Sequence, residues 1–178
     1  MQSRVTSWET DGKTERTQEV DAEIAKPDRM WAKILKGSDG ATVGTQVLWN
    51  GDTTCRIQTK FFGFPLKLTM PIADSRLKSL RGWTLADVSV ARFFKALLAD
   101  KAPIRYVGQA MFGEQQVDVL ELVTPEVVPG ITKEHIGVSL DHQSMLVREF
   151  YVGDTVVSRS HYSQQAYNIA LPPEHWNF

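Results

Sequence analysis

Turn-forming residues recur at short intervals along most of this chain, and this recurrence constrains its fold more than any other feature of the sequence. Gly, Pro, Asn and Asp mark the ends of runs of roughly 8–15 residues, as at Asp11-Gly12, Asn50-Gly51 and Gly153-Asp154. Runs of this length between turns predict antiparallel strands joined by hairpins. Asn50-Gly51 is the clearest hairpin signal, because both residues tolerate the positive φ that a type I′ turn requires at its two central positions.

Apolar and polar residues alternate in the two runs that follow this turn. A period of two predicts strands that bury one face and expose the other. The apolar face carries Cys55, Ile57 and Phe61 in the first run, and Phe64, Leu66, Leu68 and Met70 in the second. Residues 117–123 differ, because apolar residues occupy both alternating sets there, which indicates a strand covered on both faces.

One segment breaks the alternation. Residues 84–101 place apolar side chains at helical spacing, namely Val90, Phe93, Phe94, Leu97 and Leu98. Thr84 stands where an N-cap is expected, Asp87 follows three residues later as in a capping box, and Pro103 ends the segment. The sequence therefore predicts a mainly β, α+β fold in which roughly ten antiparallel strands are crossed by one helix.

Composition narrows the class of protein. The chain has 178 residues, a length that corresponds to one domain, residues 1–178. Its 20 Lys and Arg against 21 Asp and Glu give a formal net charge of -1, which argues against a general nucleic-acid binder. No apolar run approaches the ~18 residues of a transmembrane helix, and the single cysteine, Cys55, cannot form an internal disulfide.

No catalytic or metal-binding motif emerges from the residue types that usually provide one. The glycine-rich residues 37–44 lack the Lys-Ser/Thr ending of a phosphate-binding loop. Residues 137–141 resemble a nucleophile elbow only in part, since they lack its final glycine. The histidines lack the local spacing of a zinc site: His135, His142, His161 and His175. The sequence predicts a protein that is not an enzyme and that holds no metal and no cofactor.

Aromatic side chains are the remaining candidates for function. The chain has five Trp and eight Phe. These side chains would fill a core between the sheet and the helix, or they would line a ligand cavity in the same place. The pattern of residues leaves both interpretations open.

Several short motifs then occur in a familiar order. Residues 26–31 (KPDRMW) open a strand, and residues 47–52 (VLWNGD) end one in a glycine-centred hairpin. The helix with Phe93, Phe94 and Leu97, residues 137–141 (GVSLD) and the closing residues 168–178 (NIALPPEHWNF) follow. This order resembles the LolA-like family of periplasmic lipoprotein carriers. The resemblance implies an unclosed antiparallel β-barrel whose apolar concave face is lidded by helices.

The resemblance also implies a function and a place in the cell. Members of the LolA-like family bind acyl chains or lipids outside the cytoplasm and have no catalytic residues. The expectation is a periplasmic or outer-membrane-associated protein, with its signal sequence or lipid anchor removed. Two departures stand out: Trp31 occupies the place of a functional Arg of the lipoprotein carrier, and this chain starts at or inside the equivalent of the family's N-terminal helix.

The leading hypothesis is a non-enzymatic extracytoplasmic carrier or binder of a lipid or of the acyl chain of a lipoprotein. The alternative is an envelope sensor or interaction module with a packed interior and an envelope protein as its partner. An enzyme acting on lipid-like esters comes third. A continuous cavity of about 300–1,000 Å³ between sheet and helix separates the first hypothesis from the second.

The predicted ligand-binding residues belong to one apolar face. Trp31 and Leu35 share a face by parity, but the opposite register of their strand would present Met30, Ala32 and Ile34 instead. The full predicted set is Trp31, Leu35, Trp49, Ile57, Phe61, Leu66 and Leu68 from strands, with Phe94 and Leu97 from the helix.

Overall fold

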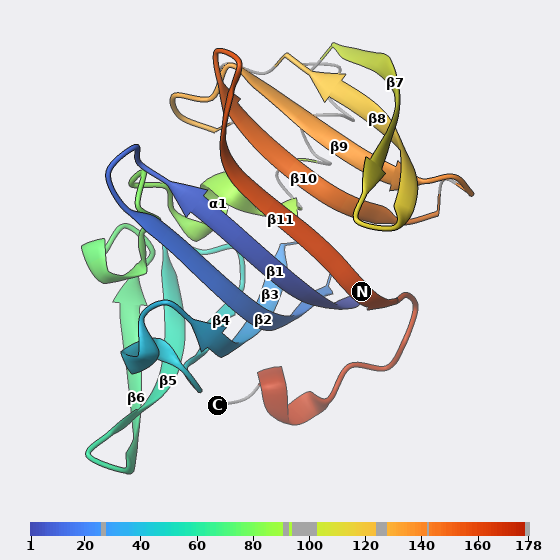
Figure 1. The fold of residues 1–178 in the computed structure, drawn as a ribbon. Helices are drawn as coiled ribbons and strands as arrows, with labels where there is room; N and C mark the ends of the chain where they lie inside the picture. Colours follow the sequence, from blue (N-terminus) through green and yellow to red (C-terminus); the bar gives the residue numbers. More distant parts are fainter. Residues whose placement is uncertain (26–27, 91–92, 94–102, 124–127, 142, 177–178) are drawn as a thin grey trace.

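Eleven antiparallel strands form one continuous sheet (Figure 1). The computed structural model describes residues 1–25, 28–90, 93, 103–123, 128–141 and 143–176. The strands are β1 (Gln2–Thr10), β2 (Glu15–Ala25), β3 (Arg29–Gly37), β4 (Gln46–Trp49), β5 (Thr54–Phe61), β6 (Phe64–Pro71), β7 (Ile104–Phe112), β8 (Gln115–Leu122), β9 (Lys133–Ser139), β10 (Met145–Val152) and β11 (Thr155–Ala166). Short 3₁₀ helices span Gly40–Thr42, Ser75–Leu77 and Pro173–Trp176, and the α-helix α1 spans Leu85–Val88.

The strand order explains how one face of the sheet becomes covered. The order is β6-β5-β4-β3-β2-β1-β11-β10-β9-β8-β7, so the first and last strands pair in the middle. Strands β6 and β7 follow each other in the chain but lie at opposite edges, and they are not paired with each other. The connection between them therefore has to cross the sheet. We call the face on which its residues 72–90 and Phe93 pack the inner face, and the other the outer face. The predicted mainly β, unclosed sheet is confirmed.

The predicted start of the helix is also confirmed. Thr84 is the N-cap of α1, and its side chain and that of Asp87 form a reciprocal capping box. Ser89 interrupts the helix with extended dihedral angles, and the Phe93 N–H then donates to the Ser89 carbonyl at 3.2 Å. Of the helix predicted over residues 84–101, residues 91–92 and 94–101 lie outside the described residues, and these include Phe94 and Leu97.

Apolar clusters on the inner face hold the crossing segment to the sheet. Trp83 packs against Val128 and Phe150, and its indole N–H donates to the Pro129 carbonyl at 2.9 Å. Phe93 packs against Leu122 and Ile136 farther along the sheet. The third cluster, on strands β4 to β6, consists of Trp49, Cys55, Ile57 and Met70. These contacts show that the described part of the crossing segment packs against one face of the sheet, as predicted.

Trp31 lies on the outer face, which corrects the first of the two predicted registers of β3. It pairs with Leu48, whereas its neighbours Met30 and Ala32 pair with Trp49 and Val47 of the inner face. The C-terminal segment packs over it: Trp176 joins Trp31 and Leu48 in one buried cluster, and the His175 ring stacks on the Trp31 ring with centroids 3.8 Å apart. The opposite register, with Met30, Ala32 and Ile34 on the inner face, is the observed one. Because β3 is covered on both sides, both of its faces are apolar, and parity alone does not tell them apart.

The hairpin predicted at Asn50-Gly51 is present, but its turn type was predicted wrongly. The loop runs from Asn50 to Thr53, and only Gly51, with a φ of 85°, has positive φ within it. The two-residue turn with positive φ at both positions is the next one, at Phe62 (50°) and Gly63 (85°), where Phe61 pairs with Phe64. This is the dihedral pattern of a type I′ turn.

Replacing Gly51 with Val is expected to lower the free energy of unfolding by about 2 kcal/mol or more, because a β-branched residue resists positive φ. A Cβ at this position would also lie 2.9 Å from the Asp28 Cβ. Gly12→Val is the matched control, since Gly12 has a φ of 92° and open space around its Cβ position. Urea unfolding of both variants should show the larger loss at Gly51; equal losses would mean that the contact with Asp28 is relieved without strain.

Candidate functional site

An apolar strip on the inner face connects the buried core to the free end of the β5–β6 hairpin. Cross-strand pairing places Trp49 beside Cys55 and Cys55 beside Met70, and in the next row Ile57 beside Leu68. By strand alternation Leu66, Phe61 and Phe64 continue this face toward the turn. We call this set the apolar track: Trp49, Cys55, Ile57, Phe61, Phe64, Leu66, Leu68 and Met70.

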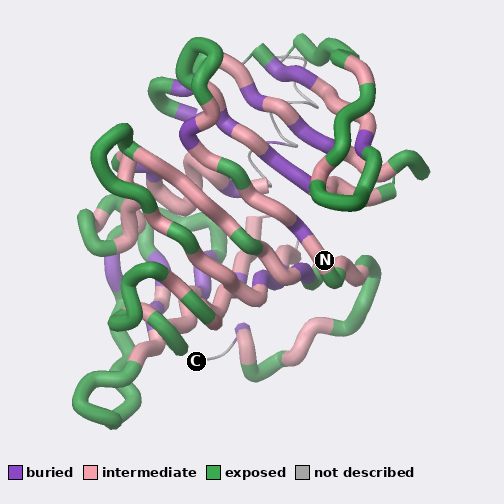
Figure 2. The backbone as a smooth tube through the Cα atoms, viewed as in Figure 1, coloured by how far each residue is buried: buried purple, intermediate pink, exposed green. Residues whose placement is uncertain are grey.

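Burial falls steadily along the track. Its inner end is covered by residues of the crossing segment, among them Ile72, Leu77 and Leu85. Leu66 and Leu68 are each 37% exposed, and the phenylalanines nearer the turn are more exposed still. Figure 2 shows this change from buried strands to an exposed hairpin end. The track is therefore an apolar surface that is closed at one end and open to solvent at the other.

Polar groups on the track are few. Thr59 is the polar residue of β5 that alternation places on the inner face, between Ile57 and Phe61. Its hydroxyl is hydrogen-bonded to that of Thr45 at 2.9 Å. The lone cysteine, Cys55, is buried in this cluster, and burial raises the pKa of its thiol, which keeps it neutral. The track can therefore shield a bound apolar group from water, but Thr59 and Cys55 give it no reactive side chain.

The structure brings together five of the nine predicted ligand-binding residues. Trp49, Ile57, Phe61, Leu66 and Leu68 belong to the track. Trp31 lies on the outer face beneath the C-terminal segment. Leu35 sits at a register shift between β2 and β3, where Ile34 pairs with Val20 and Lys36 with Glu19. Phe94 and Leu97 lie outside the described residues.

A buried ion pair ties the crossing segment to the sheet. The Arg148 guanidinium on β10 bonds to the Glu134 carboxylate on β9, and both side chains are almost completely buried. Its Nη1 also donates to the Val88 carbonyl at the end of α1 at 2.7 Å, and Phe93 and Phe150 lie against it at 5.3 and 4.7 Å. Burial is the largest single influence on Arg148 and opposes its charge, but the combined interactions with Glu134 and Tyr162 outweigh burial and raise the pKa of the guanidinium. This contact fixes where α1 lies over the sheet.

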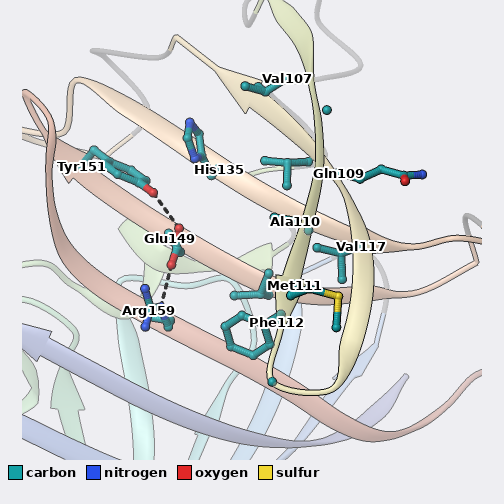
Figure 3. A pocket seen from close by; sticks show the side chains of 15 residues that line it. Val107, Gln109, Ala110, Met111, Phe112, Val117, His135, Glu149, Tyr151 and Arg159 are labelled. Atoms are coloured by element: carbon teal, nitrogen blue, oxygen red, sulfur yellow. Dashed lines mark hydrogen bonds and ion pairs between the residues drawn. The ribbon is translucent and has the colours of Figure 1, made fainter.

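A pocket of about 500 Å³ lies on the outer face, where the β7–β8 hairpin folds back over strands β8 to β11 (Figure 3). The Phe112 ring near the end of this hairpin reaches His161 on β11, with centroids 5.0 Å apart. The apolar lining includes Val117, Val119, Val147, Met111 and Phe112, and the polar lining consists mainly of His135, Glu149, Tyr151 and Arg159.

The polar groups of this pocket are engaged with one another. The Tyr151 hydroxyl donates to Glu149 at 2.7 Å, and Arg159 forms an ion pair with the same carboxylate (Figure 3). His135 lies 3.0 Å from Glu121, and its hydrogen bond is the main reason why the pKa of that carboxyl is lowered. No nucleophile–base pair is formed by these contacts. The sequence analysis missed the pocket, although the apolar residues on both faces of residues 117–123 were a signal for it.

Neither a metal-ligand cluster nor a membrane-spanning helix occurs among the described residues. No group of three or more His, Cys, Asp or Glu is placed to hold a metal ion among them. No helix within the same residues is long and apolar enough to cross a membrane.

Comparison with known proteins identifies the fold. No family model and no curated protein sequence matches the chain. Among solved structures, MucB aligns with a TM-score of 0.52 at 14% identity, over 99% of this chain and 57% of MucB. The lipoprotein LppX of Mycobacterium tuberculosis aligns with a TM-score of 0.50 at 11% identity, over 96% of this chain and 89% of LppX. A LolA superfamily protein from Nitrosomonas europaea aligns with a TM-score of 0.46 at 12% identity, over 99% and 89%.

The chain shares the fold of MucB and LppX. In this sheet the crossing segment covers the inner face, as the resemblance of the sequence implied. At 11–14% identity the comparisons extend to the fold and no further, so the ligand has to be argued from this chain's own residues.

Proposed function

We propose that this LolA-like protein is a non-enzymatic extracytoplasmic binder or carrier of lipids or lipoprotein acyl chains in the cell envelope. The apolar track supports the proposal most directly, because it leads from the exposed hairpin to a buried cluster without a charged side chain on the inner face of β5 or β6. Trp49, Ile57, Phe61, Leu66 and Leu68 would contact the acyl chain.

The energetics of such a site require no polar recognition. Each methylene that moves from water to an apolar surface contributes about 0.8 kcal/mol. An acyl chain lying along the track therefore gains affinity with length, and its head group can stay in water.

The test is an acyl-chain titration. We expect the delipidated protein to take up a fluorescent fatty-acid probe at micromolar concentration, and competing saturated fatty acids to bind up to about fourfold more tightly per added methylene. Native mass spectrometry of the freshly purified protein should detect a bound lipid. A protein that takes up no probe and carries no lipid would contradict the proposal.

A second candidate is an envelope sensor or interaction module with a packed interior. Two observations favour it: the inner-face cluster around Trp49 is tightly covered by the crossing segment, and the 500 Å³ pocket lies on the outer face instead. MucB, whose fold this chain shares, has been solved in complex with MucA from Pseudomonas aeruginosa. Failure of the acyl-chain titration would favour this candidate.

A further inference from the structure

The turn of the β5–β6 hairpin exposes three aromatic residues around Gly63. Phe61 is 62% exposed, Phe62 is 86% exposed and Phe64 is 75% exposed. The hairpin end extends away from the rest of the sheet (Figures 1 and 2). The Phe61 and Phe62 rings contact each other edge to face, with centroids 4.6 Å apart. Exposed apolar groups that are gathered in this way mark a contact surface.

Phe62 also has an unfavourable backbone conformation. Its φ is 50°, in a turn whose first position favours Asn, Asp or Gly. Bulky residues at positive φ are uncommon, and such strain is concentrated where a side chain has a function. The turn thus presents a large apolar side chain at a position where a small residue would make a more stable hairpin.

The charge of the hairpin identifies the kind of surface that it fits. Residues 53–73 contain Arg56, Lys60 and Lys67 and no Asp or Glu, although the whole chain has a net charge of -1. Lys60 and Lys67 are exposed, and neither forms an ion pair with any residue in the described part of the chain. Two free ammonium groups therefore flank the aromatic turn.

We propose that the end of the β5–β6 hairpin, residues 60–67, docks on anionic lipid bilayers. Phe61, Phe62 and Phe64 insert among the head groups and upper acyl chains, while Lys60 and Lys67 contact anionic head groups. Aromatic side chains combined with nearby basic residues are suited to this interface. Docking would also place the open end of the apolar track at the membrane, but it does not depend on acyl-chain binding by the track.

Vesicle flotation tests the proposal. We expect the wild-type protein to float with phosphatidylglycerol-containing vesicles, to bind pure phosphatidylcholine vesicles at least tenfold more weakly, and to lose binding as salt is raised. Phe62→Gly removes one inserting ring and relieves the positive φ, so its thermal stability should be unchanged or higher while vesicle binding falls about tenfold. The double variant Lys60→Glu/Lys67→Glu should lose binding to anionic vesicles.

Matched controls lie on other hairpins. Met111→Ser removes an exposed apolar side chain of β7, and Lys13→Glu reverses an exposed charge in the β1–β2 turn; both should bind vesicles like the wild type. Equal binding to neutral and anionic vesicles, or no flotation of the wild type, would overturn the proposal. A loss in the controls as large as that in Phe62→Gly would overturn it as well.

A second measurement separates docking from acyl-chain binding. Uptake of a monomeric fatty-acid probe in the absence of vesicles should be unchanged in Phe62→Gly and in the double lysine variant. Lost probe uptake in Phe62→Gly would assign the turn to the acyl-chain site and overturn its role as a docking element.

Discussion

Replacing Arg148 with Met is expected to lower the free energy of unfolding by about 3–5 kcal/mol, because the change leaves the Glu134 carboxylate buried without its partner. It also removes the donor to the Val88 carbonyl, so α1 loses its attachment to β10. Urea denaturation measures the loss. A decrease below about 1 kcal/mol would contradict a stabilising role for this ion pair and its hydrogen bond to α1.

The double variant Arg148→Met/Glu134→Leu is the control for this prediction. Replacing both members of a buried pair by apolar residues of similar volume is often neutral or stabilising. The double variant should therefore recover most of the stability that the single variant loses. If it does not, the hydrogen bond from Arg148 to Val88, and not the unpaired carboxylate, accounts for the loss.

The Phe61→Glu variant is expected to abolish acyl-chain binding, because a chain lying on the track would cover the new carboxylate and desolvate it without a partner, at a cost of several kcal/mol. Fluorescent fatty-acid titration without vesicles measures the effect. Lys60→Glu is the matched control: it introduces the same carboxylate one residue away, on the other face of β5 by strand alternation, and should leave affinity nearly unchanged. Equal binding of the probe by both variants would contradict the proposed track or the carrier function.

Local features of the chain were predictable because the residues that determine them are neighbours in sequence. The alternation of residues 55–61 and 64–70 placed Ile57, Phe61, Leu66 and Leu68 on one face, and the structure shows that face as part of the track. The capping box of Thr84 and Asp87 marked the start of α1. At Asn50-Gly51 the hairpin was predictable, but the type of its turn was not, since the loop is four residues long and only Gly51 within it has positive φ.

The sequence by itself determined the class of fold, the hairpins around the track and the polarity of their faces. Only the tertiary structure decided which face of β3 is the inner one, because Met30 and Ile34 on one side and Trp31 on the other are all apolar. Parity assigns residues to two faces but cannot say what packs on each. That depends on segments distant in the chain: residues 72–90 and Phe93 of the crossing segment cover one face, and Trp176 with His175 covers Trp31 on the other. The outer pocket has the same origin, since it forms where the β7–β8 hairpin folds over β11, a strand that begins more than thirty residues after the hairpin ends.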